Sequence, residues 1–86
     1  MTTREQVMNV VIENMIDILE VDRDVIDPAK SMVDLGANSL DIVEVVSCSM
    51  RELRVKVPRS ELSRLTNIDG LVDLLLDVSQ AKARSA

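Results

Sequence analysis

Apolar residues recur at three- and four-residue spacing near the start of the chain, the period of an amphipathic helix of about four to five turns. This apolar stripe consists of Val7, Met8, Val11, Ile12, Met15, Ile16 and Leu19. Thr2 stands three residues before Glu5. Thr3 stands at the same distance from Gln6, and both pairs have the spacing of a capping box. The pattern therefore predicts a first helix that begins beside one of these two threonines.

The stretch from Val21 to Asn38 has no helical period. Its polar breakers are Asp22, Asp24, Asp27 and Pro28, and its scattered apolar residues are Val21, Val25, Ile26, Met32 and Leu35. Loops of more than about 12–15 residues are uncommon in compact domains and are usually functional or disordered. The apolar residues favour a long connection that they pin over the core.

A second helix is predicted from about Leu40 to Leu53. Gly36 permits a positive φ shortly before Asn38 and Ser39, which are both strong N-cap residue types. One side of this helix is apolar and comprises Ile42, Val46, Met50 and Leu53, whereas Leu40, Asp41, Glu44, Cys48 and Arg51 share the opposite side. Ser49 falls within the apolar sector, where we expect its hydroxyl to bond back to its own helix.

The remaining residues predict a short and a longer helix. Val55–Pro58 is a short extended stretch, and Ser60–Leu65 forms one or two helical turns. Thr66 then caps a last helix, with Asp69 three residues on. The apolar face of that helix comprises Ile68, Leu71, Val72, Leu75 and Val78, and Gln80–Ala86 is a frayed tail. The expected fold is all-α, a small four-helix bundle of three longer helices and one short one with a long first loop, forming a single domain over residues 1–86.

Composition supports helices and excludes several function classes. Of the 86 residues, 47% are apolar, with only two Gly and two Pro to make turns. The chain contains no His, Trp, Tyr or Phe, which excludes imidazole bases, His-containing zinc sites and aromatic stacking of single-stranded nucleic acid. The apolar runs are too short for a membrane span or a secretory signal, so we expect a cytoplasmic chain without a membrane partner.

The charge is acidic and uneven. A net charge of −5 disfavours binding to nucleic acid and to anionic membranes. Residues 1–50 carry 3 basic and 10 acidic groups, so an acidic face is expected around the second helix and the preceding loop.

Neither a metal site nor a catalytic nucleophile is expected. The three aspartates Asp22, Asp24 and Asp27 lack the central glycine of a calcium loop. The single cysteine, Cys48, can form no internal disulfide and has no His to activate it. We interpret Cys48 as a small residue on the exposed side of the second helix.

The segment Asp34–Asp41 carries the most chemical information. It reads DLGANSLD and places Ser39 at the first turn of a helix, directly after a glycine bend. Free N–H groups and the positive end of the helix dipole favour a phosphodiester at that hydroxyl. The alternative is that Ser39 or Asn38 is only an N-cap, and spacing alone favours this alternative.

The longer segment DLGANSLDIVE resembles the phosphopantetheine attachment motif of acyl carrier proteins, D-x-G-x-D-S-L-x-x-x-E. The matching residues are Asp34, Gly36, Ser39, Leu40 and Glu44, and the similarity extends roughly from Val7 to Val78. Asn38 stands where the family usually has an aspartate.

The resemblance implies a carrier that catalyses nothing itself. Ser39 would bear 4′-phosphopantetheine, transferred from coenzyme A by a phosphopantetheinyl transferase, and the thiol of the arm would hold acyl intermediates as thioesters. Other implied partners are acyltransferase, ketosynthase or HMG-synthase-like enzymes with electropositive surfaces. They would dock on the second helix at Leu40, Asp41 and Glu44, with Asp34 beside them, and the carrier would be a monomer.

Three further segments suggest the type of carrier. Arg51–Arg54 stands where many fatty-acid carriers have an acidic run and an aromatic residue. Asn38–Ser39, with Val57–Leu62 and Asn67–Leu74, is more similar to free-standing polyketide carriers, some of which donate an acetyl-type unit in β-branching. The alternatives are a peptidyl carrier of nonribosomal peptide synthesis, a fatty-acid synthesis carrier and a non-carrier helical adaptor.

Overall fold

The computed structural model describes residues 3–58, 61 and 67–85. Its elements are α1 (Arg4–Leu19), the 3-10 helices η1 (Arg23–Val25) and η2 (Met32–Leu35), α2 (Ser39–Leu53) and α4 (Ile68–Ser85). These described residues include no strand, which confirms the predicted all-α class. The predicted short helix over Ser60–Leu65 lies, apart from Glu61, outside the described residues.

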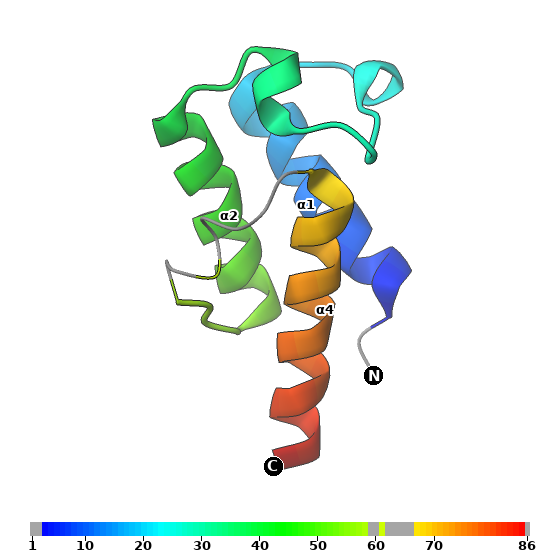
Figure 1. The fold of residues 1–86 in the computed structure, drawn as a ribbon, viewed down its shortest axis with the longest axis vertical. Helices are drawn as coiled ribbons and strands as arrows, with labels where there is room; N and C mark the ends of the chain where they lie inside the picture. The colour runs from blue at the N-terminus through cyan, green and yellow to red at the C-terminus, as the bar shows by residue number, and fades with distance from the viewer. Residues whose placement is uncertain (1–2, 59–60, 62–66, 86) are drawn as a thin grey trace.

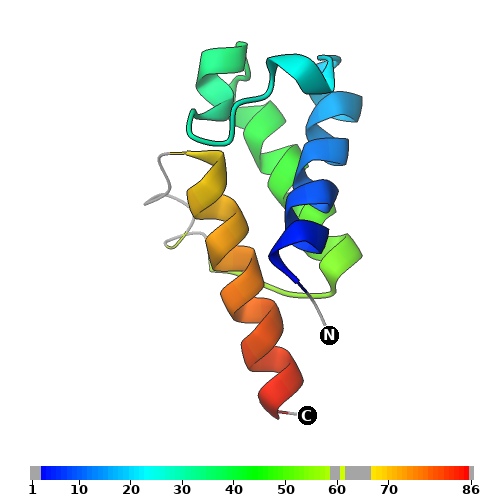
Figure 2. The same ribbon diagram turned by 90° about the vertical axis from the view of Figure 1, so that its right-hand side faces the viewer.

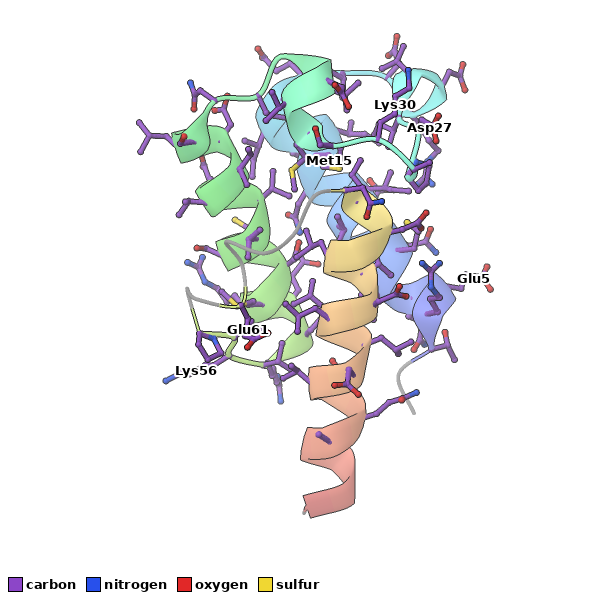
Figure 3. The ribbon with its side chains drawn as sticks, viewed as in Figure 1. Glu5, Met15, Asp27, Lys30, Lys56 and Glu61 are labelled. Atoms are coloured by element: carbon purple, nitrogen blue, oxygen red, sulfur yellow. The ribbon has the colours of Figure 1, made fainter. Side chains whose placement is uncertain are left out.

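The three long helices lie beside one another, and α1 packs against both α2 and α4. Figures 1 and 2 show that α2 and α4 run in the same general direction while α1 runs in the opposite one. The core side chains come from these helices and the segments beside them: Val7, Val11, Met15, Met32, Ala37, Val45, Val46, Val55, Val57, Ile68, Leu71, Val72 and Leu75. Figure 3 shows Met15 inside the bundle, whereas Glu5 and Lys56 project outward.

α1 begins at one of the two predicted caps. The Thr3 hydroxyl accepts a hydrogen bond from the Gln6 N–H at 3.2 Å, and the Gln6 side chain accepts from the Thr3 N–H at 2.9 Å. These reciprocal bonds satisfy two donors at the helix start. Thr2 lies outside the described residues. The predicted stripe is buried at Val7, Val11 and Met15, as expected.

The long loop crosses one end of the bundle and is bonded to the start of α4 (Figure 1). The Ile68 N–H donates to the Lys30 carbonyl at 3.0 Å, and the Asp69 N–H donates to the Pro28 carbonyl at 2.9 Å. Met32 is buried and pins the loop as predicted, but Val25 is 55% exposed. Val25 was therefore wrongly predicted as an anchor, because it lies in η1, none of whose residues is buried.

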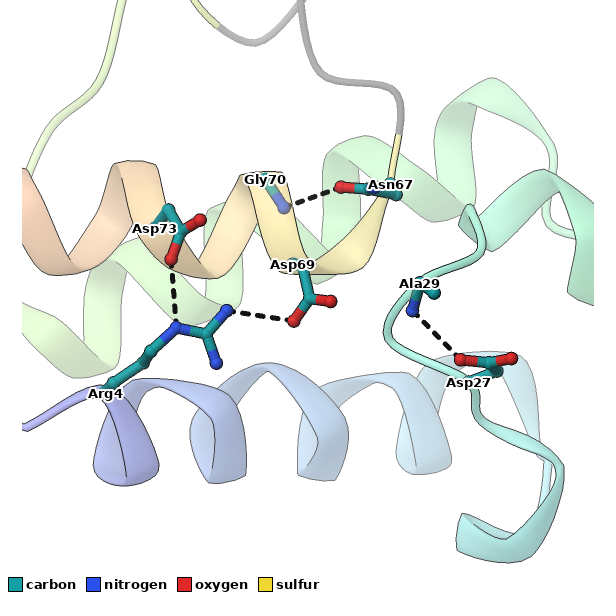
Figure 4. A network of polar contacts seen from close by, with 7 residues as sticks. All are labelled: Arg4, Asp27, Ala29, Asn67, Asp69, Gly70 and Asp73. Atoms are coloured by element: carbon teal, nitrogen blue, oxygen red, sulfur yellow. Dashed lines mark hydrogen bonds and ion pairs between the residues drawn. The ribbon is translucent and has the colours of Figure 1, made fainter.

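Side chains cap the start of α4 and tie it to α1. The Asn67 side chain accepts a hydrogen bond from the Gly70 N–H at 2.7 Å (Figure 4). Asn67 is thus a side-chain cap at the start of α4, while the predicted cap Thr66 lies outside the described residues. The Arg4 guanidinium reaches across from α1, with Nη2 2.9 Å from Asp69 and Nε 2.9 Å from Asp73. The hydrogen bonds to Asp69 and then Asp73 raise the pKa of Arg4.

α4 continues to Ser85, beyond the end of its apolar pattern. A frayed tail was expected from Gln80 onward, but the segment is helical through Ser85. Glutamine, alanine, lysine and arginine are all favourable helix residues, which explains why the helix continues through this segment. None of the helices in the described ranges is long and apolar enough to cross a membrane.

Candidate functional site

A left-handed glycine sets the direction in which the chain enters α2. Gly36 has φ 87° and ends η2, and its N–H donates to the Val33 carbonyl at 2.9 Å. The next N–H, of Ala37, donates to the Met32 carbonyl at 3.2 Å. A Cβ added at Gly36 would meet nothing within 4 Å, so the backbone conformation and not the available space requires glycine here.

Asp34 stabilises the turn that precedes this glycine. One of its carboxylate oxygens accepts from the Ser31 N–H at 3.0 Å and from the Ser31 hydroxyl at 3.3 Å. This carboxylate therefore closes a capping box on η2 while the side chain remains exposed. Asp34 thus has a structural role within the motif, in addition to the docking role expected from the resemblance.

Asn38 is the N-cap of α2. Its side-chain oxygen accepts from the Asp41 N–H at 2.8 Å, and the Asp41 carboxylate accepts from the Asn38 N–H at 3.3 Å. Asparagine performs this capping as well as aspartate does. The cap is therefore complete without a charged residue at position 38 and without Ser39.

Ser39 is the first residue of α2, and it is exposed. Its hydroxyl makes no hydrogen bond to another residue in the part of the chain that the structure describes. The start of a helix combines free N–H groups with the positive end of the dipole and stabilises a bound anion. An exposed, uncommitted hydroxyl at this position fits a covalently attached phosphodiester group.

The first turns of α2 expose apolar and acidic side chains beside Ser39. Leu40 is 80% exposed and Val43 is 50% exposed, and Glu44 is also exposed. Asp41 is half-buried. The exposure of Val43 was missed, although its position four residues after Ser39 would have placed it on the same side of the helix.

The later part of α2 has one side in the core and exposes Arg51 and Glu52. Val45, Val46 and Ser49 are its buried residues, and the Ser49 hydroxyl donates to the Val45 carbonyl at 2.8 Å, as predicted. Cys48 is half-buried, whereas an exposed position was expected. It stands three residues after the buried Val45, so the two side chains are neighbours on the helix surface.

In this structure, the loop residues Asp22, Asp24 and Asp27 do not form a group that could hold a metal ion. Within the described residues, no three or more His, Cys, Asp or Glu side chains are grouped closely enough to hold a metal ion. Asp27 instead accepts a hydrogen bond from the Ala29 N–H at 3.0 Å and so stabilises a local turn (Figure 4).

Known proteins match almost the whole chain. A family model described as "Phosphopantetheine attachment site" matches residues 9–75. The polyketide biosynthesis acyl-carrier-protein AcpK of Bacillus subtilis strain 168 is 34% identical over 79 residues, which cover 91% of this chain and 96% of that protein.

Two proteins named acyl carrier protein have a similar sequence identity to this chain. The one from Campylobacter lari is 36% identical over 72 residues, covering 83% of this chain and 88% of the relative. The one from Cyanidioschyzon merolae is 36% identical over 75 residues, which cover 86% of this chain and 82% of the relative. Members of this family bear 4′-phosphopantetheine on a serine and are carriers, not catalysts. The chain belongs to the acyl carrier protein family, with a phosphopantetheine attachment domain over most of its length.

Proposed function

We propose that this protein carries acyl groups in polyketide biosynthesis on a 4′-phosphopantetheine arm attached to Ser39. The observation that carries the proposal is the exposed Ser39 hydroxyl at the first position of α2, left free because Asn38 caps the helix. This residue lies inside the region matched by the phosphopantetheine family model. The thiol of the attached arm supplies the site for thioester formation.

The surroundings of Ser39 favour its modification. In the transfer, the Ser39 oxygen bonds to the pantetheine-side phosphorus of coenzyme A, the pyrophosphate bond breaks, and adenosine 3′,5′-bisphosphate leaves. The hydroxyl proton passes to the transferase. The dipole of α2 stabilises the resulting phosphodiester, and the neutral Asn38 adds no repelling charge beside it.

We infer that partners dock on the surface that surrounds Ser39. Carrier proteins of this family interact with phosphopantetheinyl transferases and biosynthetic enzymes in general. The proposed docking surface consists of Leu40, Asp41, Val43, Glu44 and Asp34, which combine apolar area with negative charge. An acyltransferase, ketosynthase or HMG-synthase-like enzyme with an electropositive surface would complement it. Charge complementarity accelerates encounter more than it tightens binding, which suits a carrier that visits several enzymes.

The similarity to AcpK supports the polyketide assignment, since it extends over 91% of this chain. The finer proposal is that the protein donates an acetyl-type unit in β-branching, supported by the Asn38–Ser39 pair. Peptidyl and fatty-acid carriers would use the same arm with other cargo. Loading assays with acyltransferase and adenylation partners separate these cargo classes. We place the protein in the cytoplasm on the sequence-based expectation, and family membership argues against the adaptor alternative.

Intact-mass measurement tests the attachment. The protein is incubated with coenzyme A and a promiscuous phosphopantetheinyl transferase, and it should gain the mass of one phosphopantetheine. Ser39→Ala should gain nothing, whereas Ser47→Ala, with the same substitution on the same helix, should be modified like the original protein. An unmodified protein, or an adduct retained by Ser39→Ala, would overturn the proposal.

A further inference from the structure

A buried polar pair joins α1 to α2 inside a core of mainly apolar side chains. Asn14 is 7% exposed and Ser49 is 0% exposed. The Asn14 side-chain nitrogen donates to the Ser49 hydroxyl oxygen at 3.2 Å and to the Val10 carbonyl at 3.0 Å. The Ser49 hydroxyl in turn donates to the Val45 carbonyl. Each side chain is thus bonded both to its own helix and to its partner across the helix interface.

Separating α1 from α2 at this point would break the pair. The surrounding core side chains, including Val11, Val45 and Val46, offer no replacement hydrogen bonds. A buried polar group that loses its partner bears its full desolvation cost. An intruding alkyl chain offers neither a donor nor an acceptor, so it cannot replace the bond between Asn14 and Ser49.

The pair lies on the buried side of the helix that begins at Ser39. Ser49 follows Ser39 on the same helix, about 15 Å further along its axis at 1.5 Å per residue. It belongs to the buried side of α2, together with Val45 and Val46. A long acyl chain that entered the core along this side of α2 would pass the two valines and then meet the pair. Valine is the commonest residue type in the core cluster, and its side-chain torsion is stiff.

We propose that the Asn14–Ser49 pair closes the interface between α1 and α2 to long alkyl chains, so that this carrier exposes its cargo and is suited to short acyl groups. The inference rests on the proposed attachment at Ser39. It assigns Asn14 and Ser49 as residues that determine cargo specificity without touching the attachment site.

Thioester reactivity tests the proposal. Acetyl- and octanoyl-phosphopantetheine are loaded from the corresponding coenzyme A thioesters, loading is verified by intact mass, and cleavage by hydroxylamine is timed. The two thioesters should be cleaved at rates within about twofold of each other, since an octanoyl chain left outside the core is unprotected. An octanoyl thioester cleaved about tenfold more slowly than the acetyl one would correspond to about 1.4 kcal/mol of burial and would overturn the proposal.

The double variant Asn14→Leu/Ser49→Ala tests the two residues directly. It replaces both hydrogen-bonding partners by apolar groups, a change that can be nearly neutral for stability. Octanoyl cleavage should become about threefold to tenfold slower than in the original protein, while acetyl cleavage stays unchanged. The matched control is Asn9→Leu/Ser47→Ala, which makes the same substitutions on the same helices outside the pair and should leave both rates unchanged.

The outcomes separate this inference from the proposed function. Failure of Ser39 to be loaded contradicts the proposed function, and it is detected before any rate is measured. An unchanged octanoyl rate in the loaded, folded double variant contradicts the role of the pair. If circular dichroism shows that the double variant is unfolded, Ser49→Ala alone is used, and octanoyl protection no greater than in the Ser47→Ala control contradicts the role equally.

Discussion

The two halves of α2 differ in how far their side chains are exposed to solvent, although they form one continuous helix. Over Ser39–Glu44 the helix exposes a hydroxyl, two apolar side chains and a carboxylate to solvent. Over Val45–Leu53 it buries Val45, Val46 and Ser49. The second half fixes the helix to the core, and the first half can therefore present uncommitted groups in a fixed position. A rigid helix start is well suited to modification and docking because it need not rearrange to be recognised.

The serine hydroxyls of the two halves also differ in their hydrogen bonding. At the start of α2, the hydrogen bonds between Asn38 and Asp41 complete the cap and leave Ser39 unused. In the buried half, the Ser49 hydroxyl is bonded to both Val45 and Asn14. Polar groups that are buried must find partners within the protein, whereas exposed ones remain available to other molecules.

Aspartate substitutions at Val43 and Val45, one in each half of α2, should give the largest difference in unfolding free energy. Val45→Asp places an unpaired carboxylate in the core and should cost more than about 3 kcal/mol of unfolding free energy. Val43→Asp, two residues earlier on an exposed side chain, should change it by less than about 0.5 kcal/mol. Urea unfolding followed by circular dichroism measures both, and equal losses would contradict the division of α2.

Gly36→Ala tests the turn into the exposed half. An L-residue in the left-handed region costs about 1–2 kcal/mol, and here no steric clash adds to this cost. Urea unfolding should show a loss of that size. A variant as stable as the original protein would show that entry into α2 does not depend on the positive φ of Gly36.

Ser49→Ala and Ser79→Ala compare bonded and unbonded buried hydroxyls. Ser79, on α4, is buried and its hydroxyl has no hydrogen-bond partner among the described residues. Ser49→Ala should lower the unfolding free energy by about 1–2 kcal/mol because it removes a bond to Asn14. Ser79→Ala should be neutral within about 0.5 kcal/mol or stabilising. The reverse order in urea unfolding would contradict the structural role of the Asn14–Ser49 pair.

Charge reversal at either end of α2 should have the smallest effect on stability. It should slow the encounter with the transferase only when the changed residue lies in the exposed first half of the helix. Glu44→Lys should slow the encounter with the transferase by about tenfold at low ionic strength and weaken its salt dependence. Glu52→Lys makes the same charge change at the other end of the helix and should affect the encounter much less. Loading rates measured over a range of salt concentrations test this, and equal rates for the two variants would count against the docking surface.

The sequence predicted the features that depend on local pattern. The spacing of Val7, Val11 and Met15 identified the buried side of α1, and residue type identified Asn38 as a candidate cap. Periodicity alone could not show how far neighbouring elements cover a helix side, so it missed the exposure of Val43 and of the loop residue Val25.

The burial of Asn14 was missed for a related reason. A polar residue at the margin of an apolar stripe is normally solvated, and only tertiary packing brings Ser49 within hydrogen-bonding distance. The one available signal was Ser49 itself, since a hydroxyl in an apolar sector suggests a polar partner on the facing helix.

Fragmentation mass spectrometry of the modified protein shows which residue bears the phosphopantetheine, because it locates the added group on the chain. The protein is loaded with phosphopantetheine, digested, and its peptides are sequenced. We expect the added mass on Ser39 alone, at the start of the exposed half of α2. An added group on Ser31, Ser47 or any residue other than Ser39 would contradict this expectation.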